Sequence, residues 1–164
     1  MIFVTVGTHE QQFDRLVRAV DRLVADGTIT EPVFMQTGYC TYEPEHCEWK
    51  RFLPAPEMRA HMEAANVVVT HGGPSSFIET MAAGKVPVVV PRRADLGEHV
   101  NDHQVDFVQK VAERKRGIVP VFDTKDLALA IREARQLTAG SARFESHNAE
   151  FCSELERMIE RLQG

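Results

Sequence analysis

Short apolar runs alternate along this chain with longer stretches whose apolar residues recur every three or four positions. The short runs, such as "VVVT" at 67–70, are continuous and rich in valine, which is typical of strands buried on both faces. The longer stretches, such as 13–24, predict amphipathic helices. Strands are expected at 2–6, 32–36, 49–53, 66–70, 86–91 and 118–122, and helices at 13–24, 55–65, 74–83, 101–116, 125–137 and 142–162.

This alternation of strands and helices predicts a doubly wound parallel sheet of the Rossmann-like α/β class, covered by helices on both faces. Ligands of such folds bind beyond the carboxyl ends of the strands. The loops to inspect for function are therefore those that follow strands, at 7–12, 37–44, 71–76 and 92–104.

The composition narrows the class of protein. The chain has 164 residues, which suits a single domain spanning 1–164 with a substantial core. Its net charge of −5 argues against a nucleic-acid partner, because phosphate neutralisation needs a basic face. No apolar run is long enough to span a bilayer, and no signal peptide precedes the first strand, so we expect a cytoplasmic protein.

The cysteine count is odd, and the spacing of Cys40, Cys47 and Cys152 is not that of a metal site. We interpret all three as free thiols in a reducing compartment. A disulfide between Cys40 and Cys47 is the alternative.

The motif "HGGPSS" at 71–76 joins a predicted strand to a predicted helix. Gly72 and Gly73 permit positive φ and close approach of a ligand to the backbone. The unpaired amides that open the helix, with the hydroxyls of Ser75 and Ser76, suit a phosphate. Glu79 lies one turn further on and can accept two ribose hydroxyls. The alternative is a plain turn, with Ser75 as N-cap and Glu79 solvated.

The loop at 7–12 also leads from a strand to a helix. Gly7 frees the backbone there, and Thr8 is a natural helix cap or phosphate donor. Neither the dinucleotide fingerprint nor the P-loop pattern is present. His9 and Glu10 occupy the place of a reacting group, and the alternative is a capped turn with an exposed His9.

The segment "GEHVNDHQ" at 97–104 gathers polar groups before the helix expected at 101–116. Asn101 and Gln104 carry amides that suit sugar hydroxyls, and His103 lies between them. His99 and His103 have the spacing of a metal pair, but no third ligand is evident. The alternative is that Asn101 caps the helix and the other groups are solvated.

Several of these segments closely resemble the glycosyltransferase family 28 C-terminal domain: "FVTVGTHEQ", "QTGY", "FL" before "EMRAHMEAANVVVTHGGPSS", and "KVPVVVPR…GEHVNDHQ". The resemblance covers residues 1 to about 122. Within the family, the chain resembles the small bacterial exopolysaccharide subunits of the PssE or EpsE type. It is also related to the donor half of MurG and to the eukaryotic subunit that extends dolichol-linked sugar.

The resemblance implies the donor-binding half of a GT-B enzyme that uses a UDP-sugar as donor substrate, with no metal and no other cofactor. Gly7 and Thr8 would approach the diphosphate, and Glu79 would hold the ribose. Other donor-binding residues would be His71, Gly72, Gly73, Ser75, Ser76, Arg92, Asn101, His103 and Gln104, with Arg93 as an alternative to Arg92. His9 is the catalytic candidate, although the eukaryotic subunit has Thr at this position, so that role does not transfer from it.

A GT-B enzyme needs a second half, so the expected partner is a membrane-anchored PssD-like subunit that binds a lipid-linked sugar acceptor. Through it the chain would reach the inner face of the cytoplasmic membrane. The predicted C-terminal helix carries an apolar stripe that would pack on its own domain or contact this partner; the stripe is Phe144, Phe151, Leu155, Met158 and Leu162. Two alternatives stay open, a non-catalytic accessory that binds nucleotide sugar and an unrelated α/β hydrolase or metal enzyme using His71, His99 or His103.

Overall fold

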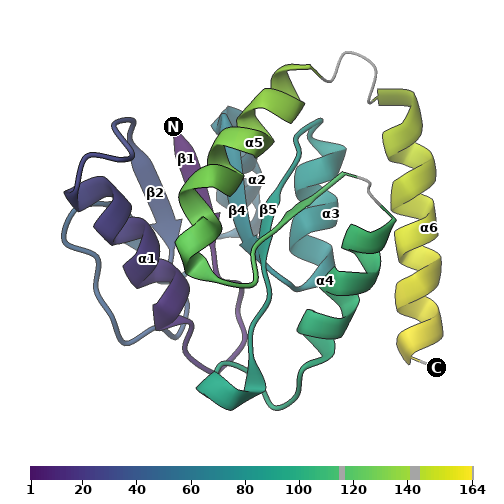
Figure 1. Ribbon diagram of the computed structural model, residues 1–164, viewed down its shortest axis with the longest axis horizontal. Coiled ribbons are helices and arrows are strands. Elements are labelled where there is room, and N and C mark those ends of the chain that lie inside the picture. The colour runs from purple at the N-terminus through teal and green to yellow at the C-terminus, as the bar shows by residue number, and fades with distance from the viewer. Residues whose placement is uncertain (115–116, 141–144, 164) are drawn as a thin grey trace.

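The computed structural model describes residues 1–114, 117–140 and 145–163, which form a six-stranded parallel sheet flanked by helices (Figure 1). The strand order is β3-β2-β1-β4-β5-β6, the doubly wound arrangement expected from the sequence. The strands are β1 (Ile2–Thr5), β2 (Val33–Gln36), β3 (Glu48–Lys50), β4 (Val67–His71), β5 (Val88–Val90) and β6 (Val119–Pro120). The helices are α1 (Asp14–Ala25), α2 (Ala55–Ala64), α3 (Pro74–Ala82), α4 (His103–Glu113), α5 (Leu127–Ala139) and α6 (Glu145–Gln163), with 3₁₀ turns at Ala94–Leu96 and Thr124–Asp126.

Alternate residues of each central strand point to opposite faces of the sheet, and both faces are buried. In β4, Val67 and Val69 pack with α1 and α5, whereas Val68 packs with α2 on the other face. Val89 of β5 joins α3, α4 and α6 on that second face. This two-sided burial explains why the strands read as unbroken valine runs.

The main differences from the predicted elements lie at the starts of α1 and α4 and at the end of β3, next to the loops with candidate site residues. α1 begins at Asp14, so the loop after β1 runs through Phe13, and the α1 amide at Asp14 is already bonded to Gln12 Oε1 at 2.8 Å. α4 begins at His103 because Asn101 and Asp102 form a turn before it. β3 covers 48–50 instead of 49–53, which leaves Phe52 and Leu53 in a loop.

The C-terminal helix α6 lies beside α3 and α4 (Figure 1). Leu155 is fully buried there against Phe77, Phe107 and Val108, and Met158 is partly buried in the same cluster. This part of the predicted stripe therefore packs on its own domain, so Leu155 is not available to a partner. Phe144 and the side chains of Phe151 and Leu162 lie outside the described residues.

Cys40 and Cys47 are free thiols, as expected, and no disulfide joins them. The side chain of Cys152 is not among those described. Within the described ranges, no helix is long and apolar enough to cross a membrane.

The packing of α6 predicts a large loss of stability on truncation of Leu155. Leu155→Ala should lower the free energy of unfolding by about 2–5 kcal/mol, the range for a buried leucine that leaves a cavity. Leu129→Ala, at a position 63% exposed on α5, is the matched control and should change it by less than about 0.5 kcal/mol. Urea unfolding measures both. Equal, small effects would mean that α6 does not dock on α3 and α4.

Candidate functional site

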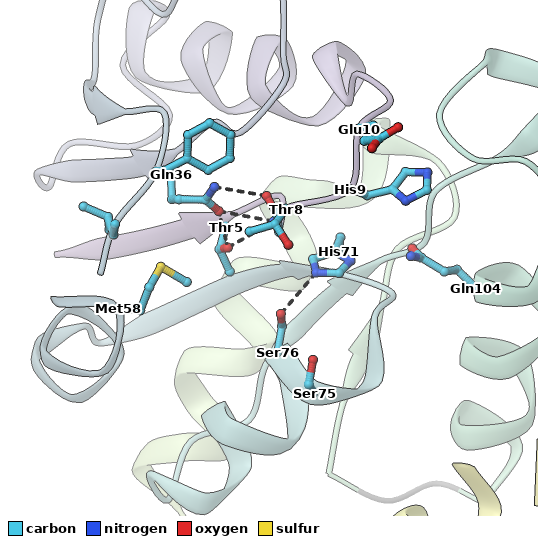
Figure 2. Close-up of a pocket in the computed structure, with 13 residues that line it drawn as sticks. Thr5, Thr8, His9, Glu10, Gln36, Met58, His71, Ser75, Ser76 and Gln104 are labelled. Carbon is cyan, nitrogen blue, oxygen red and sulfur yellow. Dashed lines mark hydrogen bonds between the residues drawn. The ribbon is translucent and has the colours of Figure 1, made fainter. Parts of the chain in front are cut away.

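A cleft of about 610 Å³ opens at the carboxyl ends of the strands (Figure 2). Loops from distant parts of the sequence meet there because parallel strands deliver them to the same edge. The cleft is lined by Thr5, Gly7, Thr8, His9, Glu10, Gln36, Phe52, Leu53, Met58, His71, Ser75, Ser76 and Gln104.

His71, the last residue of β4, is wedged between two glycines of different loops. Its Nδ1 accepts the Gly73 N–H at 3.0 Å, and its Nε2 donates to Ser76 Oγ at 3.1 Å (Figure 2 shows the second bond). A Cβ atom would lie 2.5 Å from Nε2 if added at Gly7, and 2.1 Å from Cε1 if added at Gly73. The ring therefore requires glycine at both positions, since a close-packed interior offers no room to shift.

The same contacts determine the protonation of His71. Burial lowers its pKa to about 3, and the positive charges of Arg92 and His9 add to this effect. The ring is thus neutral near pH 7, and its only lone pair accepts the Gly73 amide. His71 is consequently a structural support of the cleft and has no free lone pair with which to act as a base.

The glycines of "HGGPSS" have a different role from the one that the sequence predicts. Neither Gly72 nor Gly73 has a positive φ; that of Gly73 is −71°. Gly73 makes room for His71, and a Cβ at Gly72 would lie 3.0 Å from Gln104 Cβ and from Pro91 Cα. Their amides are also occupied, because Gly72 donates to Gln104 Oε1 and Gly73 to His71. The positive φ lies instead at Gly7, at 77°.

The helix α3 begins directly at the cleft and has no side-chain cap. Gly73 is its N-cap, and Pro74 follows with no N–H to offer. The amides of Ser75 and Ser76 have no intrahelical partner, and the helix dipole places partial positive charge on them. This terminus therefore offers donors to an anion, and its N-cap is Gly73 instead of Ser75. The amide end of α1 does not line the cleft, whereas Gln104, in the first turn of α4, does.

Thr5 and Gln36 support the Gly7 loop, a role that no local sequence pattern indicates. Gln36 is buried; its Nε2 donates to Gly7 O at 3.0 Å and to Arg51 O at 2.8 Å. Its Oε1 accepts from Thr5 Oγ1 at 2.6 Å and from the Gly7 amide at 3.2 Å. One amide side chain thus joins the loops that follow β1 and β3, which fixes the floor of the cleft.

Arg92 lies beneath the cleft and does not line it. The side chain is completely buried, and its guanidinium donates to the carbonyl oxygens of Val6, Gln11, Gln12 and Glu98. Direct neutralisation of a phosphate by Arg92 is therefore incompatible with this arrangement. Burial lowers its pKa to about 10, so it remains charged at neutral pH and its field reaches His71 and His99.

The charge of Arg92 is not cancelled by the nearby carboxylate. Glu98 is buried but forms a two-point ion pair with Arg15, with N···O distances of 2.8 and 3.0 Å, and also accepts the Arg93 amide. Arg15 and Glu98 neutralise each other, which leaves one positive charge below the first loop. The side chain of Arg93, the alternative phosphate contact, instead pairs with Asp95.

His9 and Gln104 extend the cleft toward α4. The His9 ring stacks on His99, with centroids 4.4 Å apart and planes at 11°. Gln104 Oε1 accepts from the amides of Gly72 and Arg92, each at 3.1 Å, so it ties the end of β4 to the end of β5.

Gln104 also lines a second pocket of about 520 Å³ between α3, α4 and α6. Its other lining residues include Gly72 and His103 from the predicted set, and His99, Asp106, Phe107, Lys110 and Ile159. The two pockets are adjacent because Gln104 forms part of both walls.

The predicted site residues are thus only partly brought together. The first cleft holds Gly7, Thr8, His9, His71, Ser75, Ser76 and Gln104, and the second adds Gly72 and His103. Gly73, Glu79, Arg92 and Asn101 line neither. Glu79 is exposed on α3, and Asn101 Oδ1 accepts the His103 amide at 3.1 Å in the turn before α4, whose N-cap is Asp102. Among the described side chains, no three His, Cys, Asp or Glu gather as a metal site.

One wall of the first cleft is apolar, and the sequence pattern did not predict this wall. Leu53 and Met58 lie there with Phe52, which is 45% exposed and stacks edge-on against Tyr39 at 5.2 Å. Because the predicted strand at 49–53 included residues 52 and 53, these two residues were expected to be part of the sheet and not of a cleft wall. The "FL" pair was the available signal, since exposed apolar residues next to a polar loop indicate a binding surface.

Comparison with solved structures gives the class of protein. A glycosyltransferase of kitacinnamycin matches with a TM-score of 0.59 and 18% identity over 98% of this chain and 42% of that one. The glycosyltransferase SnogD from Streptomyces nogalater matches with a TM-score of 0.55 and 16% identity over 99% of this chain and 44% of that one. The fold is therefore that of one half of a GT-B glycosyltransferase, and the chain spans less than half the length of these proteins.

The family follows from the sequence. Residues 1–155 match the glycosyltransferase family 28 C-terminal domain, so the chain belongs to that family. A comparison with curated proteins found no significant match. Membership confirms the resemblance to this family and sets aside an unrelated hydrolase.

The neutral, buried His71 predicts a specific dependence of stability on pH. Its pKa of about 3 in the fold lies below the value of 6.5 in an exposed chain, so the unfolded chain binds one more proton between these values. Stability should fall as the pH drops through this window, by up to about 1.4 kcal/mol per pH unit from His71 alone. His71→Asn keeps an acceptor for the Gly73 amide but cannot titrate.

Urea unfolding of both proteins at several pH values from 7 to 4 isolates this contribution, because other carboxylates and histidines titrate equally in each. The variant should be less stable at pH 7 and should lose less stability on acidification. Identical slopes would show that His71 is not buried in its neutral form.

Proposed function

We propose that this chain is the UDP-sugar-binding catalytic subunit of a glycosyltransferase that passes a hexose to a lipid-linked acceptor. The observation that carries the proposal is the uncapped start of α3, which opens into the same cleft as the Gly7–Thr8 loop. Both features offer donors to an anion, and the buried charge of Arg92 lies behind them. A diphosphate fits this arrangement through backbone amides and hydroxyls, so we propose that no metal is needed.

One end of the cleft is apolar and the other is polar, as are the base and the sugar of a nucleotide sugar. A planar pyrimidine suits the apolar wall of Phe52, Leu53 and Met58. Met58 of this wall lies across the cleft from Gln104 (Figure 2). The sugar would extend past Gln104 into the second pocket, where His103 and Asp106 are available to hydroxyl groups. Ser75 and Ser76 lie between, at the place of the diphosphate.

Glu79 keeps its proposed role as the ribose contact. It lies four residues after Ser75 and three after Ser76, on the helical face that these serines share. Its carboxylate is exposed and forms no ion pair among the described residues, so it is available to accept hydroxyl groups.

A catalytic subunit is favoured over a non-catalytic accessory by His9, which lines the cleft on the side of the proposed sugar pocket. A histidine can exchange protons near neutral pH, and no comparable group is needed merely to bind a nucleotide. We place His9 as the general base or leaving-group contact.

The acceptor site is proposed to belong to a partner. The matched glycosyltransferases have more than half of their length beyond the region that this chain covers. By analogy with PssE-like subunits of exopolysaccharide synthesis, we propose a membrane-anchored PssD-like chain as the second half. The chain would then act at the inner face of the cytoplasmic membrane.

Calorimetry with UDP in the presence of a chelator tests the donor site. UDP should bind, and Glu79→Ala should weaken binding by about 1–3 kcal/mol because it leaves the ribose hydroxyls unpaired. With 2′-deoxy-UDP, the same substitution should cost less, since one hydroxyl is already missing. Glu113→Ala removes an exposed carboxylate from α4 and is the control expected to bind as wild type.

Failure of UDP to bind, or binding only with a divalent cation, contradicts the metal-independent site. Unchanged UDP affinity in Glu79→Ala removes that residue from the ribose contact but leaves the diphosphate site in place.

If the acceptor site belongs to a partner, this chain alone should bind the donor, and sugar transfer should need both chains. Alone, the chain should bind UDP and transfer little sugar, because it lacks an acceptor site; with the PssD-like chain it should move to the membrane fraction and transfer. Assays with UDP-galactose, UDP-glucose, UDP-glucuronic acid and UDP-GlcNAc identify the donor. Full transfer by the isolated chain onto a lipid-linked acceptor would refute a two-chain enzyme.

A further inference from the structure

The stacked pair His9–His99 joins two loops that are distant in the sequence. His9 belongs to the loop after β1 and lines the first cleft, whereas His99 belongs to the loop after β5 and lines the second pocket. Their rings are 4.4 Å apart and nearly parallel at 11°. This contact spans the boundary between the two pockets, where the proposed diphosphate and sugar would meet.

Hydrogen bonds give each ring a defined tautomer. His99 Nδ1 accepts the Asn101 amide at 3.3 Å, so the proton of neutral His99 is on Nε2. His9 Nε2 lies 2.9 Å from Gln11 Oε1, which is an acceptor, so this nitrogen of His9 carries the proton. The open acceptor of His9 is therefore Nδ1.

We propose that His99 is a positioning residue for His9: it holds the imidazole by stacking, with Gln11 fixing the proton on Nε2, so that Nδ1 of His9 is the acceptor presented to the cleft. The role of His9 as a base rests on the proposed function, but the positioning is a property of the chain alone. Without the stack, His9 would lie on a loop with no regular structure between β1 and α1, and its ring would lose one of the two contacts that restrict its χ angles.

The charges around the pair favour a neutral His99 ring. Burial lowers the pKa of His99, and the charges of His9 and Arg92 lower it further, which favours the neutral form of His99. A neutral ring below an imidazolium is an attractive contact, because the cation lies over a π face. The titratable or charged groups around His9 are Glu10 on its own loop, His99, the buried Arg92 and His71.

The test compares His99→Ala, which removes the ring, with His99→Phe, which keeps a ring that cannot titrate. Val100→Ala, at the neighbouring position that is 75% exposed, is the control for disturbance of the loop. In the isolated chain at pH 9, NMR should show His9 ring protons shifted by the stacked ring and a single Nε2–H tautomer in wild type, Val100→Ala and His99→Phe. His99→Ala should lose the shift, because the stacked ring is gone.

Transfer is then measured with the acceptor-binding partner and the donor that the wild-type pair uses. His99→Ala should lower kcat by about tenfold to a hundredfold with the donor KM nearly unchanged, since a misplaced catalytic group affects the chemical step. His99→Phe should restore most of the rate, and His9→Ala should lose at least as much as His99→Ala. A normal kcat in His99→Ala, or no rescue by His99→Phe, overturns the proposal.

The NMR measurement separates this proposal from the proposed function. If the wild-type pair transfers no sugar, the proposed function fails, while the ring shifts still decide whether His99 holds His9. Unchanged His9 signals in His99→Ala overturn the positioning role, whatever the transfer assay gives.

Discussion

The cleft depends on the placement of one neutral imidazole, that of His71, between Gly7 and Gly73. Because the ring accepts the Gly73 amide and donates to Ser76, it sets the turn from which α3 begins. Because a side chain at Gly7 would collide with it, it also sets how closely the first loop approaches. The two loops that offer donors to an anion are thus held at a fixed separation by a single side chain, which must stay uncharged to remain buried.

Two further polar side chains, Gln36 and Gln104, hold the loops around the cleft together. Gln36 ties the first loop to the loop after β3, and Gln104 ties the end of β4 to the end of β5. Arg92 lies under both, with a buried charge that its neighbours do not cancel. The cleft therefore has a hydrogen-bonded floor above a buried positive charge, and His9, Glu10 and Phe52 also line it. Preorganised dipoles and charge of this kind are suited to a diphosphate.

The sequence predicted the parallel sheet, because unbroken valine runs are typical of strands buried on both faces, and it predicted the edge that carries the cleft. It also placed Ser75, Ser76 and Gln104 correctly near each other. It could not reveal why glycine is needed in "HGGPSS", since the cause is a ring packed against Gly7, which lies more than sixty residues away. Arg92, expected to contact a phosphate, is instead buried for a similar reason: its partners are carbonyl groups of distant residues, which no local pattern reveals. The apolar wall at Phe52 was hidden within an expected strand.

The most direct test is a crystal structure of the chain with UDP, grown in the presence of a chelator. The diphosphate should lie within about 3 Å of the Ser75 and Ser76 amides, the typical distance of a hydrogen bond to an anion, with the base against Phe52 and Leu53. The His71 contacts with Gly73 and Ser76 should be unchanged, because the frame is already formed. A diphosphate bound elsewhere, or a His71 ring that turns away to contact it, would contradict a cleft preorganised around His71.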